Sequence, residues 1–124
     1  MVFYKPYSNQ KEIAELFPQT DFSEDTVYGA YTALENEAVT GKCLVKIRGT
    51  ACELLDLEAL QSDALLIEGL VRSALHFAAN RGAYTAECRL EAIKDVLLLL
   101  GFREENGVFQ GTIPDLLAGG CCKH

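Results

Sequence analysis

The sequence predicts one α+β domain built on a mixed, mostly antiparallel sheet. Three observations support this prediction: two β-rich segments at 26–34 and 42–48 that follow each other along the chain, a long amphipathic helix at 63–80 between strand-like segments, and a hairpin signal near the C-terminus. With 124 residues, of which 49% are apolar, the chain can bury one hydrophobic core without disulfides.

The first expected element is a short helix that follows Asn9. Asn9 and Glu12 have the spacing of a capping box, and the apolar residues within 13–17 recur at helical spacing. Pro18 ends this helix because it cannot continue the backbone hydrogen bonds, and the acidic residues at 21–25 are typical of a turn.

Three strands are expected next. Residues 26–34 are rich in β-branched and aromatic side chains, and 42–48 alternate apolar with basic residues after a loop that ends at Gly41, so we expect an antiparallel pair. The Glu, Leu and Ala content of 51–60 favours a helix by propensity. Because Gly49-Thr50 has the character of a hairpin turn, we interpret 51–60 as a third strand.

The clearest helix spans residues 63–80, capped by Ser62 or Asp63 and stopped at Gly82. A strand-like segment at 84–88 follows, which completes the strand–helix–strand order of a parallel βαβ unit. One face of the helix carries a continuous apolar stripe: Ile67, Leu70, Val71, Ala74, Leu75 and Ala78.

A second helix is expected at 91–100 and is broken by Gly101-Phe102. Asn106-Gly107 then predicts a tight hairpin. We expect residues 113–124 to form an extended or mobile tail that contains two cysteines.

The composition excludes several classes of function. A net charge of −7 argues against nucleic-acid binding and against anionic membrane surfaces, both of which favour a basic face. The apolar runs are too short to span a membrane, and the N-terminus lacks the apolar core of a signal peptide. We therefore expect a cytoplasmic protein.

The five cysteines do not suggest a disulfide framework, because their number is odd and no export signal accompanies them. Cys43 and Cys52 lie in strand-like segments and are expected to be buried as small apolar residues. Cys121, Cys122 and His124 resemble half of a metal site, and the alternative interpretation is a frayed tail without a metal.

The order of these elements, over roughly residues 27–113, resembles the GNAT acyltransferase superfamily. The segment 69–82, with its Ala-x-x-x-Gly ending, is similar to the family's helix after the acetyl-CoA loop, and Leu100-Gly101-Phe102 is similar to its next helix end. The resemblance implies helices on both faces of the sheet, acetyl-CoA as co-substrate, a small amine as acyl acceptor, and often a homodimer. It also implies that the third strand splays from the fourth, with the pyrophosphate at the N-terminus of the following helix.

The resemblance assigns positions for cofactor binding and for proton donation, and this sequence departs from the family at both. The family's two loop glycines correspond to Leu65 and Ile67, and the carboxylates of Asp63 and Glu68 would repel a pyrophosphate. The position of the family's proton-donating Tyr is Leu97. The cofactor-binding set is Ala64, Leu65, Leu66, Ile67, Glu68, Gly69 and Arg72.

Two residues are candidates for catalysis. Glu53, on the third strand, is the first choice for a base that deprotonates the amine, with Asp56 the next. Cys88, at the end of the following strand, is a candidate nucleophile or a neighbour of the thioester. The alternatives are that the carboxylates are ordinary solvated strand residues and that Cys88 is buried and inert.

Three hypotheses for the function follow. The first is an N-acetyltransferase that moves an acetyl group from acetyl-CoA to a small amine. The second is a GNAT-like domain that has lost catalysis and acts as a ligand-binding or interaction module. The third is a metal-binding protein that uses the Cys and His residues of the C-terminal tail.

Overall fold

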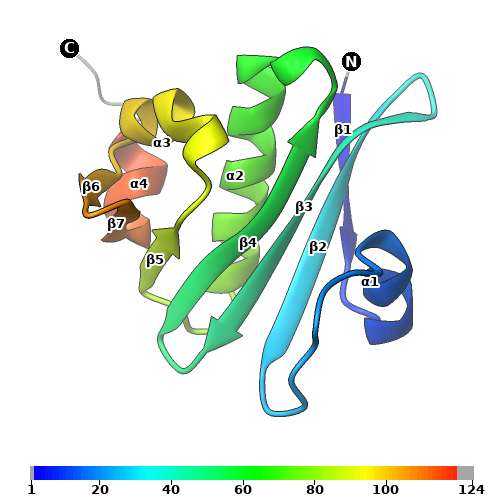
Figure 1. The fold of residues 1–124 in the computed structure, drawn as a ribbon, viewed down its shortest axis with the longest axis horizontal. Coiled ribbons are helices and arrows are strands. Elements are labelled where there is room, and N and C mark those ends of the chain that lie inside the picture. Colours follow the sequence, from blue (N-terminus) through cyan, green and yellow to red (C-terminus); the bar gives the residue numbers. More distant parts are fainter. Residues whose placement is uncertain (1, 120–124) are drawn as a thin grey trace.

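The computed structural model describes residues 2–119. Within that range the chain forms a seven-stranded sheet in the order β1-β2-β3-β4-β5-β7-β6, with helices on both faces (Figure 1). The strands are β1 (Val2–Tyr7), β2 (Val27–Glu35), β3 (Ala38–Arg48), β4 (Ala51–Ala59), β5 (Thr85–Cys88), β6 (Arg103–Glu105) and β7 (Val108–Thr112). The helices are α1 (Gln10–Leu16), α2 (Ala64–Ala79), α3 (Lys94–Leu100) and α4 (Ile113–Gly119), with 3₁₀ turns η1 (Leu60–Ser62) and η2 (Glu91–Ile93).

Strand pairing confirms the predicted α+β class. The pairs β1–β2, β2–β3, β3–β4, β5–β7 and β6–β7 are antiparallel, and β4–β5 is parallel. Helix α2 provides the crossover between the two parallel strands, as the βαβ pattern predicts. No helix among residues 2–119 combines the length and the apolar character that crossing a membrane requires.

Two hydrophobic clusters hold the layers together. The larger cluster packs α2, α3 and α4 against one face of the sheet and includes the fully buried Leu70, Leu97 and Phe109. The smaller cluster lies under α1 on the opposite face and contains Ile13, Phe17, Ala30 and Leu44. The stripe that the sequence assigns to α2 is buried throughout.

Three features differ from the sequence expectations. Strand β1 was not predicted; it lies at the edge of the sheet, where Pro6 is tolerated because edge strands need fewer donors. The expected loop up to Gly41 is instead a turn at Asn36-Glu37, both with positive φ (54° and 69°), so β2 and β3 are longer than predicted.

The third difference concerns the tail. Residues Ile113–Gly119 form helix α4, so the extended segment expected from residue 113 is wrong for this stretch. Pro114 lies in the first turn, where a missing N–H has no consequence, and Leu116 is buried in the core. The expectation for 120–124 falls outside the described residues.

Candidate functional site

The strands β4 and β5 pair over only four residues each. Ala51–Leu54 are in register with Thr85–Cys88, and β4 then continues to Ala59 while β5 ends (Figure 1). A bulge in β4 coincides with this point, since Leu54 pairs with Val45, Asp56 pairs with Leu44, and the intervening residue is extra. We call the region where β4 runs on beyond β5 the fork. At the fork, residues 55–59 of β4 extend beyond the end of β5. Their backbone therefore faces no β5 partner, although β4 lies in the middle of the sheet.

The chain leads from the fork through η1 to the N-terminus of α2. A 16-residue helix presents unpaired N–H groups and a partial positive charge at this end, which suits an anion. Here the Asp63 carboxylate accepts from Leu65 N (3.0 Å) and Leu66 N (3.3 Å), and the Asp63 carbonyl accepts from Ile67 N (2.9 Å). The protein's own carboxylate therefore occupies the donors that the resemblance assigns to a pyrophosphate.

The predicted cofactor-binding residues have mixed surroundings. Leu66 and Ile67 are buried in the core rather than on the rim, whereas the Leu65 side chain is 78% exposed. At the two positions that are glycine in the family, the Ile67 side chain thus points into the core and the Leu65 side chain toward solvent.

Glu68, Gly69 and Arg72 have structural contacts of their own. Arg72 Nε donates to Glu68 Oε2 (3.0 Å), and Arg72 Nη1 donates to the carbonyl of Leu117, which ties α4 to α2. At Gly69 a Cβ would lie 1.9 Å from the hydroxyl of Tyr4, so the glycine makes room for an aromatic ring of β1. Burial and the nearby carboxylates raise the pKa of Tyr4 above its usual value, so this hydroxyl stays protonated at neutral pH.

Glu53 belongs to a network of charges at the start of the fork. Its carboxylate accepts from Arg89 Nη1 (2.9 Å) and lies 3.6 Å from Lys46 Nζ, with one fifth of the side chain exposed. Sequence reasoning missed both cations. The pairing of Lys46 with Glu53 was accessible from the sequence, because the Gly49-Thr50 turn fixes the register of this hairpin.

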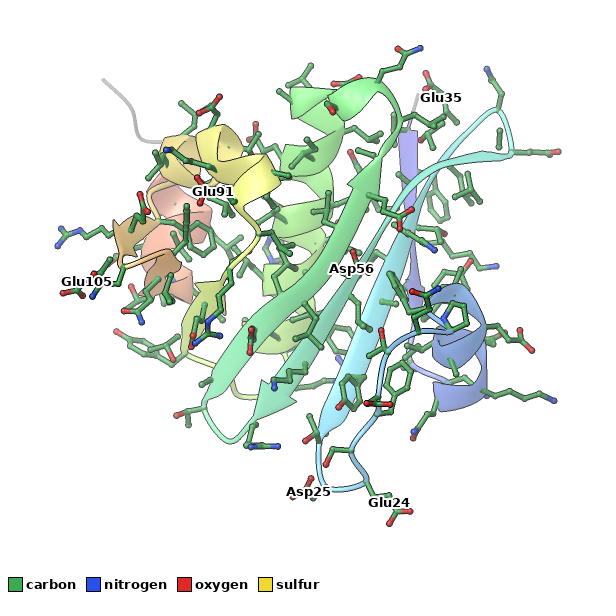
Figure 2. The ribbon with its side chains drawn as sticks, in the orientation of Figure 1. Glu24, Asp25, Glu35, Asp56, Glu91 and Glu105 are labelled. Atoms are coloured by element: carbon green, nitrogen blue, oxygen red, sulfur yellow. The ribbon has the colours of Figure 1, made fainter. Side chains whose placement is uncertain are left out.

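Asp56 lies near the middle of the sheet on the face that α1 covers (Figure 2). With Glu58 and Lys42 it lines a hollow of about 270 Å³ between β3, β4 and the segment after α1. Lys42 Nζ donates to the carbonyl of Leu16, so this lysine also fixes the end of α1. A larger hollow of about 980 Å³ is bounded by the paired part of β4 and β5, the β6–β7 hairpin and α4, so it lies outside the fork.

Cys88 is fully buried at the last paired position of β5. Desolvation raises the pKa of its thiol to about 11, and those of Cys43 and Cys52 to about 12. A thiol with such a pKa is neutral at pH 7, whereas the nucleophile in thiol chemistry is the thiolate. The geometry therefore favours the inert interpretation of Cys88.

We expect these three thiols to resist modification in the folded protein. In a Cys121→Ser/Cys122→Ser variant, Ellman's reagent at pH 8 should label no thiol rapidly, and should label three after denaturation. Between about pH 9 and 11 the unfolded chain loses thiol protons that the folded chain keeps, so the free energy of unfolding should fall as the pH rises through this window. Rapid labelling that Cys88→Ser abolishes would restore Cys88 as a nucleophile.

The proton-donating Tyr that the resemblance implies has no counterpart at the corresponding position of this chain. Leu97 is fully buried in the core, so this position is apolar and structural. Among residues 2–119 no group of three His, Cys, Asp or Glu side chains is arranged to hold a metal ion. The candidate ligands Cys121, Cys122 and His124 lie outside the described residues.

Comparison with solved structures identifies the fold. The ribosomal-protein-S18-alanine N-acetyltransferase of Escherichia coli superposes with a TM-score of 0.65 at 12% identity, covering 91% of this chain and 94% of that one. The IAA acetyltransferase of Bacillus cereus gives 0.65 at 15% identity, with 90% and 99% covered. YhhK of E. coli, described as an N-acetyl transferase and solved bound to coenzyme A, gives 0.62 at 18% identity, with 90% and 98% covered.

No protein-family model and no curated protein sequence matches the chain. The solved structures nevertheless agree on the architecture over nine tenths of its length. The chain therefore has the fold of the GNAT N-acetyltransferases, which confirms the resemblance at the level of the fold.

Proposed function

We propose that the chain is an acetyl-CoA-dependent N-acetyltransferase that acts on a small amine. The observation that supports this most is the fork, where residues 55–59 of β4 continue past the end of β5 directly before the N-terminus of α2. A GNAT-fold structure with coenzyme A bound shows that this architecture accepts such a ligand.

The residues at the fork fit the pantetheine chain of acetyl-CoA better than they fit its phosphates. The backbone of residues 55–59 offers N–H and C=O groups that can pair with the amides of an extended pantetheine chain. The N–H groups of Leu65 and Leu66 can bind a phosphate only when the Asp63 carboxylate turns away from them. Bound acetyl-CoA would supply the activated acyl group.

The proposed proton acceptor is Glu53. In this role the Glu53 carboxylate exchanges its contact with Arg89 or Lys46 for a contact with the ammonium group of the acceptor. It then takes a proton from that ammonium, which leaves a neutral, nucleophilic amine. Because Leu97 carries no hydroxyl, the leaving thiolate would take its proton from water. Asp56, on the same face of β4, is the second candidate for the base.

Replacement of Glu53 tests this assignment. With an amine panel and thiol release as the assay, Glu53→Gln should lower kcat by about 100-fold, the usual contribution of a general base, while the Kd for acetyl-CoA changes less than about threefold. Glu35→Gln changes an exposed carboxylate at the end of β2, outside the fork, so it is the control and should retain wild-type turnover. Equal rates for Glu53→Gln and wild type would remove Glu53 from the mechanism.

A specific observation also favours the second candidate, a GNAT-fold binding module without catalysis. Asp63 saturates two donors of the α2 N-terminus, so the anion site is filled by the chain itself. Under this alternative, acetyl-CoA at millimolar concentration would neither release heat nor raise Tm. The two candidates are thus separated before any acceptor is identified.

We also propose that the protein works in the cytoplasm as a homodimer. The acidic net charge supports the expectation that it binds neither nucleic acid nor anionic membranes. Light scattering at micromolar concentration tests the dimer directly, and a molecular mass near that of one chain would contradict it.

A further inference from the structure

Two carboxylates stand side by side at the start of the fork. The parallel register places Glu53 of β4 opposite Glu87 of β5, one residue before the last paired position. Their side chains are only 20% and 34% exposed, so water screens them incompletely. Like charges directly across a strand pair are destabilising. Without a cation between them, these two carboxylates would repel each other and weaken the last pairs between β4 and β5.

Arg89 links both carboxylates. Its Nη1 lies 2.9 Å from Glu53 Oε2 and its Nη2 lies 2.6 Å from Glu87 Oε2, so the two arms of one guanidinium hold two strands. The planar fork of donors suits this task, whereas an ammonium group is a single point charge. Lys46 of β3 adds a second cation on Glu53 at 3.6 Å.

The position of Arg89 in the chain gives this link a consequence for the site. Arg89 follows Cys88, the last residue of β5 that pairs with β4, so the guanidinium lies at the vertex of the fork. Neutralising Glu53 and Glu87 there keeps the final pairs closed.

We propose that Arg89 is a positioning residue that sets where β4 and β5 separate and so places residues 55–59 of β4, the proposed pantetheine-binding stretch. The effect on ligand binding rests on the proposed function, whereas the effect on the strands does not. Without Arg89 the repulsion between the carboxylates loosens the last pairs, and removal of one carboxylate relieves that repulsion.

Amide hydrogen exchange measured by NMR tests the effect on the strands. In Arg89→Ala the amide of Glu87, which points toward β4 as that of Thr85 does, should exchange about tenfold faster than in wild type, while amides in the β2–β3 pair stay unchanged. Arg89→Ala/Glu87→Gln should return the exchange to within about threefold of wild type. Arg89→Lys should give an intermediate rate, because one ammonium replaces a two-armed link. Since Arg89 is about half exposed, 1 M salt should reduce the difference in exchange rate between Arg89→Ala and wild type.

Acetyl-CoA titrations on the same variants test the consequence for binding. The Kd should rise about tenfold in Arg89→Ala and recover in the double variant. If wild type binds no acetyl-CoA but the exchange pattern holds, the proposed function fails and the role of Arg89 at the fork stands. Wild-type exchange in Arg89→Ala, or a double variant as fast as the single one, would overturn the proposal.

Discussion

Asp63→Asn is expected to tighten acetyl-CoA binding by about tenfold with little change in stability. Asparagine caps a helix as well as aspartate does, so α2 keeps its first turn. The substitution removes only the charge that faces the incoming pyrophosphate. At about 5 Å and an effective dielectric constant of about 40, one charge contributes roughly 1.7 kcal/mol of repulsion per phosphate charge, more than tenfold in Kd.

Two further variants separate charge from capping. Asp63→Ala removes both, so we expect tighter binding together with a loss of about 1 kcal/mol of folding stability. Asp95→Asn removes the same charge from the first turn of α3 and is the control for net charge. Calorimetric titration and urea denaturation measure the two quantities. Unchanged affinity in both Asp63 variants would show that Asp63 does not face the ligand.

Gly29→Ala is expected to cause the largest loss of stability among single-methyl changes. A Cβ at Gly29 would lie 2.3 Å from two ring atoms of Phe77, which is itself 4% exposed and packed against Tyr31 and Arg81. Because the ring is buried among these neighbours, we expect a loss of about 1–3 kcal/mol and a Tm lower by roughly 4–12 °C.

A double-variant cycle tests the cause of that loss. Phe77→Leu should be less damaging in the Gly29→Ala background than in wild type, because the smaller side chain accepts the methyl group. Gly69→Ala is the matched comparison. Its clash is with the hydroxyl end of the half-buried Tyr4 on an edge strand, and alanine improves helix propensity by about 1 kcal/mol, so the net change should stay within about 1 kcal/mol. Equal losses at Gly29 and Gly69 would contradict the packing argument.

Local signals were sufficient to predict most of the fold. The cap at Asp63 (one of the two predicted candidates), the stripe of α2, the stop at Gly101 and the Asn106-Gly107 turn all depend on neighbours in the sequence, and each is where the pattern predicts. Strand β1 is different, because six residues at an edge become a strand only through pairing with β2.

The site was less accessible to sequence reasoning than the fold. The pattern indicated that Asp63 opposes a phosphate and that Ser62 or Asp63 caps the helix, but not that Asp63 is the one that fills two donors. The link from Arg89 to Glu53 and Glu87 depends on the register of two strands separated by a 16-residue helix. Burial of Cys88 likewise comes from the packing of α2 and α3, which the sequence around it does not encode.

An NMR titration of the wild-type protein with acetyl-CoA tests the central claim most directly. If the fork is a working cofactor site, saturable shifts should appear in the amides of residues 55–59 and of Leu65 and Leu66, while amides in α1 and the β6–β7 hairpin stay in place. Saturable shifts at the fork, enlarged in Asp63→Asn, are the predicted result. A spectrum unchanged at millimolar acetyl-CoA in both proteins would contradict the transferase and leave a GNAT-fold module that binds something else.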